Sequence, residues 1–389
     1  MPDPDLGPSR PLVPPLHSAA VYTLPDLDAL DAIMEGDAPG FIYARDGHPN
    51  AADLAGRLAQ LEAPTDPAVW GTVTGSGMGA ITAALLALLQ AGDRVVASDK
   101  LYGRTAQLLQ QELSRFGVRT DWVDATDTHA VNKALQEPAR VLFVETMSNP
   151  LVRVVDVGRL AGIAYDRGCK FVVDNTFATP ILARPLEVGA TVVVESLTKM
   201  IGGHSDVTLG VVAGTDPDLL PAINQVVSIW GLAANPFDCW QTLRGLATLD
   251  LRVRAATATA AALADWLVRQ AGVSRVVYPG RKDHPDHALA RSVLPQGCGN
   301  MLCFELAGGR EAVNRFLRQA AHHPAGPGVP FSPSLGHTGT TCSYPAGTSH
   351  RYVSPAERRR QGITDGLVRL SVGVEPLEVI QAEFRRGLA

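Results

Sequence analysis

Short, almost wholly apolar runs alternate with segments of helical spacing through the first two thirds of the chain. Fully apolar strands are typical of sheets buried on both faces, so the pattern predicts an α/β domain with a large parallel sheet covered by helices. The predicted strands are 69–75, 94–98, 118–123, 141–145, 170–174 and 191–195, and the predicted helices are 52–63, 81–90, 105–117 and 157–168.

The pattern changes after about Thr248, where a smaller C-terminal α+β domain is predicted. Its elements are an Ala-rich helix over 252–269, strands at 301–306 and 368–373, and a terminal helix. The first 50 residues have many Pro and Gly and no sustained periodicity, so an extended arm is expected there. The predicted division is therefore an arm (1–50), an α/β domain (51–248) and an α+β domain (249–389).

The composition favours a protein that acts on small molecules. The 389 residues carry 34 basic and 39 acidic side chains, a formal charge of -5, so no footprint for nucleic acid or an anionic membrane is present. The acidic, Pro-rich N-terminus is unlike a secretory signal, and the longest apolar run, 81–89, is too short to span a bilayer. A cytoplasmic protein without a membrane segment is the expectation.

Cysteines and histidines give no pattern of metal ligands. The pairs His284/His287 and His322/His323 lack a third ligand nearby, and we expect them to be exposed to solvent. His204 follows two glycines near Lys199, where it either supports the site or makes a structural hydrogen bond. The cysteines are scattered and odd in number, which predicts buried free thiols at Cys169, Cys239, Cys298, Cys303 and Cys342.

The loops that follow the predicted strands carry the candidate chemistry. In a parallel sheet these loops share one edge, where ligands bind. Ser76-Gly77-Met78 opens a helix whose free N–H groups attract a phosphate. The same edge receives an aromatic ring, a carboxylate and a lysine, from Tyr102, Asp174 and the loop Ser196–Lys199. Together these are the groups that pyridoxal 5'-phosphate (PLP) requires.

PLP chemistry assigns a role to each of them. The lysine amine forms a Schiff base, the carboxylate keeps the pyridine nitrogen protonated, and the aromatic ring stacks on the cofactor. One rival is a dinucleotide-binding dehydrogenase, because residues 75–80 fit G-x-G-x-x-A and Asp99 follows about 20 residues later. That alternative leaves Asp174 and Lys199 without a role. A non-catalytic protein of the same fold is a third alternative, and the joint presence of Lys199, Asp174 and Tyr102 argues against it.

Ordered motifs from Tyr43 to Glu375 resemble the Cys/Met-metabolism family of PLP enzymes, which includes cystathionine γ-lyase, cystathionine γ-synthase and methionine γ-lyase. The matching stretches are YAR (43–45), SGM (76–78), LYGRT (101–105), ETMSNP (145–150), VVDNTFATP (172–180), ESLTKMIGGHSDV (195–207), NPFDCWQTLRGLATLDLR (235–252), YPG (278–280), SLG (334–336), PAGTSH (345–350) and VRLSVGVE (368–375).

The resemblance implies the aspartate-aminotransferase-like fold (fold type I) and a homotetramer built as a dimer of dimers. It implies that Lys199 carries the cofactor, that Asp174 faces the pyridine nitrogen, and that Tyr102 stacks on the ring and assists the leaving group. It further implies three groups of contacts: Gly77, Met78, Thr176, Ser196 and Thr198 around the cofactor; Tyr43 and Arg45 reaching the phosphate from a neighbouring subunit; and Asn149, Ser334, Leu335 and Arg369 near the substrate.

The activity implied is a cystathionine γ-lyase-like carbon–sulfur lyase acting on sulfur amino acids by α,γ- or α,β-elimination. A γ-replacement enzyme, such as cystathionine γ-synthase or an O-acylhomoserine sulfhydrylase, is the alternative. Several positions depart from the usual family pattern: His48-Pro49-Asn50, Met147, Thr191, Glu195 and the loop 334–341. Gly339 stands where a glutamate is common near the distal end of the substrate, and we expect this glycine to broaden the substrate range.

Overall fold

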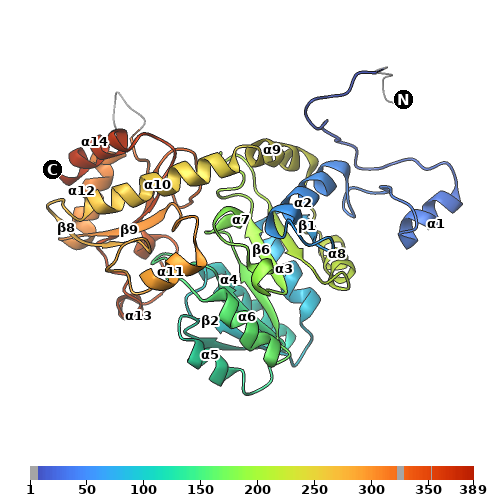
Figure 1. Cartoon of the computed structure of the whole chain (residues 1–389), viewed down its shortest axis with the longest axis horizontal. Coiled ribbons are helices and arrows are strands. Elements are labelled where there is room, and N and C mark those ends of the chain that lie inside the picture. The colour runs from blue at the N-terminus through green and yellow to red at the C-terminus, as the bar shows by residue number, and fades with distance from the viewer. Residues whose placement is uncertain (1–7, 322–327, 352) are drawn as a thin grey trace.

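A computed structural model describes residues 8–321, 328–351 and 353–389. Figure 1 shows two sheet-containing parts joined by the long helix α10 (Leu249–Leu267), with an N-terminal arm extending from the opposite end. The predicted α/β and α+β parts are both present. None of the described helices is long and apolar enough to cross a membrane.

The larger sheet has seven strands, and one of them departs from the prediction of a parallel sheet. The strand β7 (Gly210–Gly214) was not predicted, and it runs antiparallel to both of its neighbours. A Cβ atom on Gly214 would lie 2.5 Å from the Trp70 ring, so only glycine lets the strand pack so closely. The strand order is β1 (Trp70–Thr74), β7, β6 (Val192–Ser196), β5 (Lys170–Asp174), β4 (Val141–Glu145), β2 (Arg94–Ser98) and β3 (Arg119–Val123).

Helices cover both faces of this sheet, as the apolar strands predicted. Residues of α3 (Gly77–Leu88) and α8 (Leu219–Ile229) share one buried core with the sheet, and residues of α5 (Thr128–Ala134) and α6 (Val157–Asp166) share another. The helix α2 (Pro49–Glu62) packs against β1 and β7. Shorter elements are α7 (Thr179–Leu182), η3 (Pro185–Val188) and α9 (Pro236–Leu246).

The helix predicted over 105–117 is not one regular α-helix. The helix α4 (Gly103–Gln107) passes into a π-helical turn, η1 (Leu108–Glu112), and then a 3₁₀ turn, η2 (Leu113–Phe116). Gly117 ends the segment with a φ of 84°, and its N–H bonds to the carbonyls of Leu113 and Ser114. The tightened last turn satisfies carbonyl groups that would otherwise lack partners at the helix end.

The smaller sheet is antiparallel throughout, in the order β10 (Thr341–Ser343), β11 (Leu367–Ser371), β9 (Met301–Leu306) and β8 (Val273–Val277). Phe304 of β9 packs against Phe316 and Phe384, with ring centroids 5.3 and 5.7 Å away. These two rings come from α12 (Gly309–Ala320) and α14 (Leu377–Leu388), so the helices cover one face of the sheet. The remaining elements are α11 (His287–Val293), η4 (Pro345–Gly347) and α13 (Pro355–Arg360).

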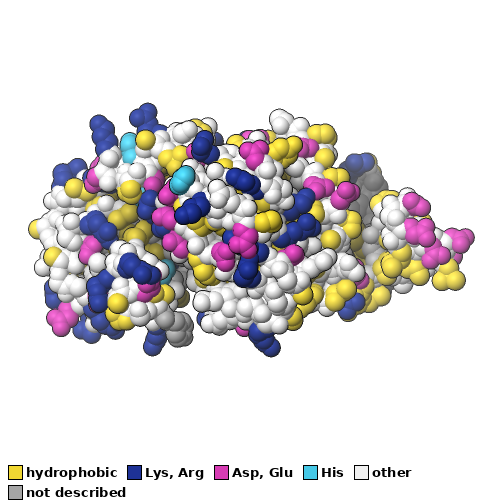
Figure 2. All heavy atoms as spheres, turned by 90° about the horizontal axis from the view of Figure 1, so that it is seen from below, with side chains coloured by type: hydrophobic (Ala, Val, Ile, Leu, Met, Phe, Trp, Pro, Cys, Tyr) yellow, Lys and Arg dark blue, Asp and Glu magenta, His cyan; other side chains and the backbone are white. Residues whose placement is uncertain are grey.

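The arm is extended as predicted, but it contains a helix that its sequence did not reveal, α1 (Leu27–Glu35). Asp26 caps this helix by accepting a hydrogen bond from Ala29 N. Leu27 and Met34 are 74% and 72% exposed, so these two apolar side chains of α1 are not covered by the part of the chain that the structure describes. In Figure 2 apolar side chains gather on this arm, whereas charges of both signs are mixed over the body.

Candidate active site

The loop after β6 places Lys199 against a loop from the smaller sheet. Lys199 Nζ donates a hydrogen bond of 2.9 Å to Ser334 Oγ, across 135 residues of sequence. Gly336 makes this approach possible, because its φ is +84° and a Cβ there would lie 2.5 Å from the carbonyl carbon of Lys199. The two predicted residues Lys199 and Ser334 are therefore brought together by contact between the two sheet-containing parts.

Arg369 lies beside this pair, on β11, and is only 4% exposed. Its guanidinium donates to Asn149 Oδ1 at 2.9 Å and to the Ser334 carbonyl oxygen at 3.1 Å. Its Nε is buried without a hydrogen-bond partner, and no carboxylate of the described residues forms an ion pair with it. Burial lowers the pKa of Arg369 because the charged form is poorly solvated there. A buried cation in this state favours an anionic ligand.

The environment of Lys199 favours the neutral amine. Burial lowers the pKa of Lys199, and the positive charge of Arg369 lowers it further. A neutral amine can act as a nucleophile or accept a proton, and an ammonium can do neither. Leu335, which was also predicted at this site, is buried beside Ser334.

Asp174 ends β5 and faces the same edge of the sheet. One of its carboxylate oxygens accepts a 3.0 Å hydrogen bond from Thr176 N, and burial raises its pKa. Thr176 Oγ1 accepts from Ser196 N at 2.9 Å, which ties the Asp174 loop to the Lys199 loop. The carboxylate is thus fixed between two loops that were predicted to share the site.

Glu145 is a candidate residue of the site that the sequence reasoning missed. It pairs in register with Asp174 across β4 and β5, and its carboxylate accepts a hydrogen bond from Tyr102 N. Burial raises the pKa of Glu145 well above its ordinary value, and the charge of Asp174 adds to the shift. Its position offered a signal, because Glu145 ends its strand as Asp174 ends the next one.

The segment after β1 forms a narrow cradle. Ser76 caps α3 by accepting a hydrogen bond from Gly79 N at 2.9 Å. A Cβ on Gly77 would lie 2.6 Å from Ser196 Cβ, so glycine keeps the first N–H groups of α3 open toward Ser196. Met78 lies in this first turn. Thr198 Oγ1 is engaged elsewhere, because it donates to Leu209 O at 3.3 Å and accepts from Leu209 N at 3.2 Å.

Tyr102 lies near the site, whereas the predicted residues Tyr43 and Arg45 make no hydrogen bond or ion pair with it among the described residues. Tyr102 is 39% exposed, and it lies near the Arg369 guanidinium. Tyr43 is 41% exposed, and the Arg45 guanidinium carbon lies 5.1 Å from its ring centroid. Among the described residues no hydrogen bond or ion pair links Tyr43 or Arg45 to Lys199 or Asp174. Both belong to the arm.

His48 and Asn50, which depart from the family pattern, have structural partners. His48 caps α2, because its Nδ1 accepts from Ala51 N at 3.2 Å while its Nε2 lies 3.2 Å from Ala234 O. Burial lowers the pKa of His48, which favours the neutral ring. Asn50 accepts from His17 N and donates to Pro15 O, both at 2.8 Å, and so it holds the arm on α2.

The expectation that His284 and His287 are exposed is wrong. His284 is 6% exposed and His287 is partly buried. His284 Nδ1 accepts from Asp286 N, and Asp286 in turn binds the Arg153 guanidinium at 2.6 and 2.9 Å. This network joins the two sheet-containing parts, which the sequence could not reveal.

His322 and His323 lie outside the described residues. Within the described residues no group of three or more metal-ligating side chains is present.

The structure also tests the predictions for His204 and for the five cysteines. His204 is exposed, and its Nδ1 lies 2.7 Å from Gly202 O, so the structural hydrogen bond is the alternative that the structure supports. All five cysteines are free and buried, which confirms the prediction. Burial raises the pKa of Cys303 to about 12, so this thiol stays protonated at neutral pH.

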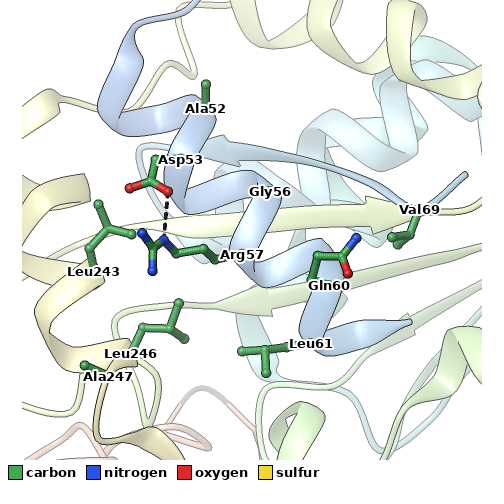
Figure 3. A pocket seen from close by; sticks show the side chains of 10 residues that line it. All are labelled: Ala52, Asp53, Gly56, Arg57, Gln60, Leu61, Val69, Leu243, Leu246 and Ala247. Atoms are coloured by element: carbon green, nitrogen blue, oxygen red, sulfur yellow. Dashed lines mark hydrogen bonds and ion pairs between the residues drawn. The ribbon is translucent and has the colours of Figure 1, made fainter. Parts of the chain in front are cut away.

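A separate open groove lies away from these residues. Figure 3 shows it on the outer side of α2 and α9, with the Asp53–Arg57 ion pair of 2.7 Å at its centre. Leu61, Leu243 and Leu246 supply apolar lining. None of the predicted catalytic, cofactor or substrate residues lines this groove.

The residues at the sheet edge fit PLP. Lys199 offers an amine whose pKa is lowered by burial, Asp174 offers a fixed carboxylate, and Gly77 leaves room that a side chain would fill. No other cofactor accounts for an amine, a carboxylate and a helix N-terminus at one edge as directly. The fold and site therefore define a PLP-dependent enzyme of fold type I.

Comparison with known proteins agrees with this class and narrows it. Residues 5–389 match the family described as Cys/Met metabolism PLP-dependent enzyme. The chain belongs to this family. The Pseudomonas aeruginosa O-succinylhomoserine sulfhydrylase is 40% identical over 378 residues, covering 96% of this chain and 91% of that protein. The Pseudomonas putida L-methionine gamma-lyase is 37% identical over 379 residues, covering 97% and 92%.

A solved structure gives the same result for the fold. The cystathionine gamma synthase of Xanthomonas oryzae pv. oryzae, solved in complex with cystathionine, is 35% identical with a TM-score of 0.87, and the match covers 97% of this chain and 92% of that one. The chain is therefore a PLP-dependent enzyme of Cys and Met metabolism, and the dehydrogenase alternative is wrong. Residues 75–80 join β1 to the first turn of α3, and the Asp99 carboxylate pairs with Lys100 at 2.9 Å.

Proposed function

We propose that this enzyme is a carbon–sulfur lyase that removes the side-chain sulfur group of sulfur amino acids by α,γ- or α,β-elimination. The observation that carries the proposal is the contact of Lys199 with Ser334 beside the unpaired Arg369 guanidinium. This arrangement places the Lys199 amine, which can accept a proton, next to the Arg369 guanidinium, which can bind an α-carboxylate. An amino acid held there would present its Cα hydrogen to Lys199.

Each predicted residue has a proposed role around the cofactor. Lys199 would hold PLP covalently through its amine, and Asp174 would keep the pyridine nitrogen charged. Tyr102 would stack on the ring and assist the leaving group. When bound, PLP supplies an electron sink that stabilises negative charge on the substrate. The phosphate would be held by the N–H groups of Gly77 and Met78 and by the hydroxyls of Ser196 and Thr198, with Thr198 exchanging its hydrogen bond to Leu209 O for one to the phosphate. Thr176 would line the cofactor site.

The substrate carboxylate would be held by Arg369, with Asn149 fixing the guanidinium and Ser334 and Leu335 completing the wall. Arg369 can donate two parallel N–H groups to a carboxylate, and its hydrogen bonds to Asn149 and Ser334 set the orientation of the fork. Lys199 would then accept the Cα proton, release it again, and remove a proton from Cβ. The electron pair left by that Cβ proton would form the Cβ–Cγ double bond and expel the γ-substituent as a thiolate.

A γ-replacement activity is the second candidate. The observations that favour it are the 40% identity with an enzyme named O-succinylhomoserine sulfhydrylase and the match to a cystathionine gamma synthase. The same residues serve both reactions up to the loss of the γ-substituent. The outcome then depends on whether a thiol or water reaches the site.

The distal end of the substrate site carries a charge that the sequence did not predict. Gly339 lacks a side chain, but the Glu375 carboxylate lies beside it, 3.4 Å from where a Cβ would be. Glu375 accepts hydrogen bonds from Thr340 N and Thr340 Oγ1, so its carboxylate is held in place. We propose that Gly339 widens this end of the site and that Glu375 keeps it acidic.

We further propose that the site is shared between subunits in a homotetramer. The exposed apolar residues of the arm, such as Leu27 and Met34, support an arm that packs on another subunit and brings Tyr43 and Arg45 to its phosphate. The arm (1–50), the PLP-binding domain (51–248) and the C-terminal domain (249–389) remain the proposed division. The five free thiols support a cytoplasmic location.

One experiment tests the function directly. The purified protein, loaded with PLP, is incubated with cystathionine, methionine, homocysteine, cysteine and O-acyl-homoserines, and the 2-oxo acid, the thiol and any replacement product are measured. The proposal expects 2-oxo acid from thioethers, with Lys199→Ala inactive. Borohydride reduction followed by peptide mapping should place the cofactor on Lys199. Replacement product without 2-oxo acid would favour the second candidate, and cofactor on another lysine would overturn both.

A further inference from the structure

Two glutamates are buried together behind the edge of the sheet that carries the cofactor residues. Glu62 is the last residue of α2 and is 1% exposed, and Glu195 lies in β6 and is 2% exposed. Asp174 pairs in register with Val194, so Glu195 points to the opposite face of the sheet from Asp174. The two glutamates therefore lie directly behind the residues of the proposed site.

The two carboxyl groups face one another within hydrogen-bonding reach, with the Asn175 side chain beside both. None of their four oxygens is paired with a donor from the described residues. Asn175 Nδ2 donates one hydrogen to Ala183 O at 2.9 Å and Oδ1 accepts from Thr146 Oγ1 at 2.8 Å, so only one Asn175 N–H remains for the two carboxyl groups. A carboxyl pair contains no donor unless one member holds a proton.

The charges around the pair do not neutralise it. Arg184 is the nearby cation, but its guanidinium pairs with Glu187 at 3.7 Å, and its buried Nε has no partner. Burial raises the pKa of both glutamates, and for Glu195 the charges of Glu62 and Asp174 add to the shift. Two ionised carboxylates enclosed with a single N–H donor between them would repel each other strongly.

We propose that Glu62 and Glu195 share one proton as a buried acid–carboxylate pair, and that this shared proton positions the two loops that carry Asp174 and Ser196. Glu195 directly precedes Ser196, and Asn175 directly follows Asp174. Asn175 N donates to Val194 O at 3.0 Å, which ties both loops to the backbone next to the pair. The role of this pair in cofactor binding rests on the function proposed for Asp174. The existence of a shared proton is independent of that function.

Loss of the shared proton would add a second negative charge behind Asp174. Because the pKa of the pair is raised above that of an unfolded glutamate, its stabilising contribution is present at low pH and is lost as the pH rises through the raised pKa. The groups that face the pair are Asp174, Arg184 and Glu187, and of these only Arg184 opposes the repulsion. The loops should therefore loosen at alkaline pH, and PLP should be released with them.

Infrared spectroscopy of the holoenzyme tests the shared proton. The wild-type protein at neutral pH should show the C=O stretch of a protonated carboxylic acid, and labelling with ¹³C-glutamate should shift that band. The pKa of Glu145 is also raised, so the spectra are compared in a Glu145→Gln background, which removes any band from that residue. In this background Glu62→Gln and Glu195→Gln should each remove the remaining band, because the new amide donates to the remaining carboxylate. Absence of a glutamic acid band in Glu145→Gln, or its persistence in both double variants, would overturn the proposal.

The pH profile tests the positioning role and needs no active variant. The melting temperature of the holoenzyme and its retained PLP absorbance should fall with rising pH in the wild type, and Glu195→Gln should shift this loss to higher pH. Glu311→Gln, at an exposed glutamate on α12 that is not among the groups facing the pair, is the control and should keep the wild-type profile. Identical profiles for all three proteins would overturn the positioning role. If Glu195→Gln does not fold, the pH titration of the wild-type infrared band tests the proposal instead. A band that titrates in the pH range of an ordinary glutamate would show that Glu62 and Glu195 do not share a proton.

Discussion

Replacing Arg369 with methionine should separate substrate binding from stability. Arg369 is buried with two neutral hydrogen-bond partners and no ion pair among the described residues, so its charge is uncompensated until a carboxylate binds. Replacing a buried charge by an apolar side chain of similar volume is often neutral or stabilising. We therefore expect Arg369→Met to keep or raise the melting temperature and to lose activity.

The size of the loss follows from the contact that is removed. Truncating one partner of a buried, hydrogen-bonded charge pair costs about 2–5 kcal/mol, which corresponds to a fall of about 30-fold to several thousand-fold in kcat/KM. A second effect concerns pH. Arg369 lowers the pKa of Lys199, so its removal should raise that pKa, and the acidic limb of the kcat profile should move to higher pH.

The assay is 2-oxo acid release from methionine or cystathionine over a range of pH, with the melting temperature measured in parallel. Arg275→Met is the control, because Arg275 is 41% exposed and pairs with Glu305 at 3.1 Å on the surface of the smaller sheet. The control should change kcat/KM by less than about twofold. A fall below about tenfold for Arg369→Met, or a large loss of melting temperature without a change in the pH limb, would refute the assigned role.

Three further predictions concern the cofactor and the substrate. Asp174→Asn should retain PLP but lose about 30-fold or more in kcat, because an amide cannot hold a pyridinium charge, and near-normal turnover would remove Asp174 from this role. Mixing Arg45→Ala with Lys199→Ala should restore about a quarter of the wild-type sites through hybrid dimers, and no recovery after verified subunit exchange would place Arg45 outside a shared site. A Cβ at position 339 would make only van der Waals contacts of 3.4 Å or more, and Gly339→Glu adds a carboxylate beside Glu375, so kcat/KM for cystathionine over methionine should rise by up to about tenfold, with Gly339→Gln as the neutral control. An unchanged ratio in a folded, PLP-loaded variant would show that residue 339 does not set specificity.

The strand positions followed from the sequence wherever the strands are apolar and buried. The strands predicted at 94–98, 141–145, 170–174 and 301–306 have the same bounds in the structure. The strand β7 was missed because its glycines give no strand propensity, and their value lies in close packing against Trp70 and Ser76. The irregular segment after α4 was missed because helical spacing does not distinguish an α-helix from π and 3₁₀ turns.

Sequence alone indicated the cofactor, which the family match confirms, and it indicated candidate residues at one edge of the sheet, because loops after parallel strands meet there wherever the strands lie in the sheet. Only the tertiary structure decided how these residues act on one another. Burial lowers the pKa of Lys199, and Arg369 lowers it further, although Arg369 is 170 residues away in the chain and reaches the site through β11. The burial of Glu62 against Glu195, the carboxylate of Glu375 beside Gly339, and the Arg153–Asp286 pair likewise depend on packing between distant segments. Hydrophobic patterning records which face of a strand is buried, but it does not record which charged side chain will be buried next to another.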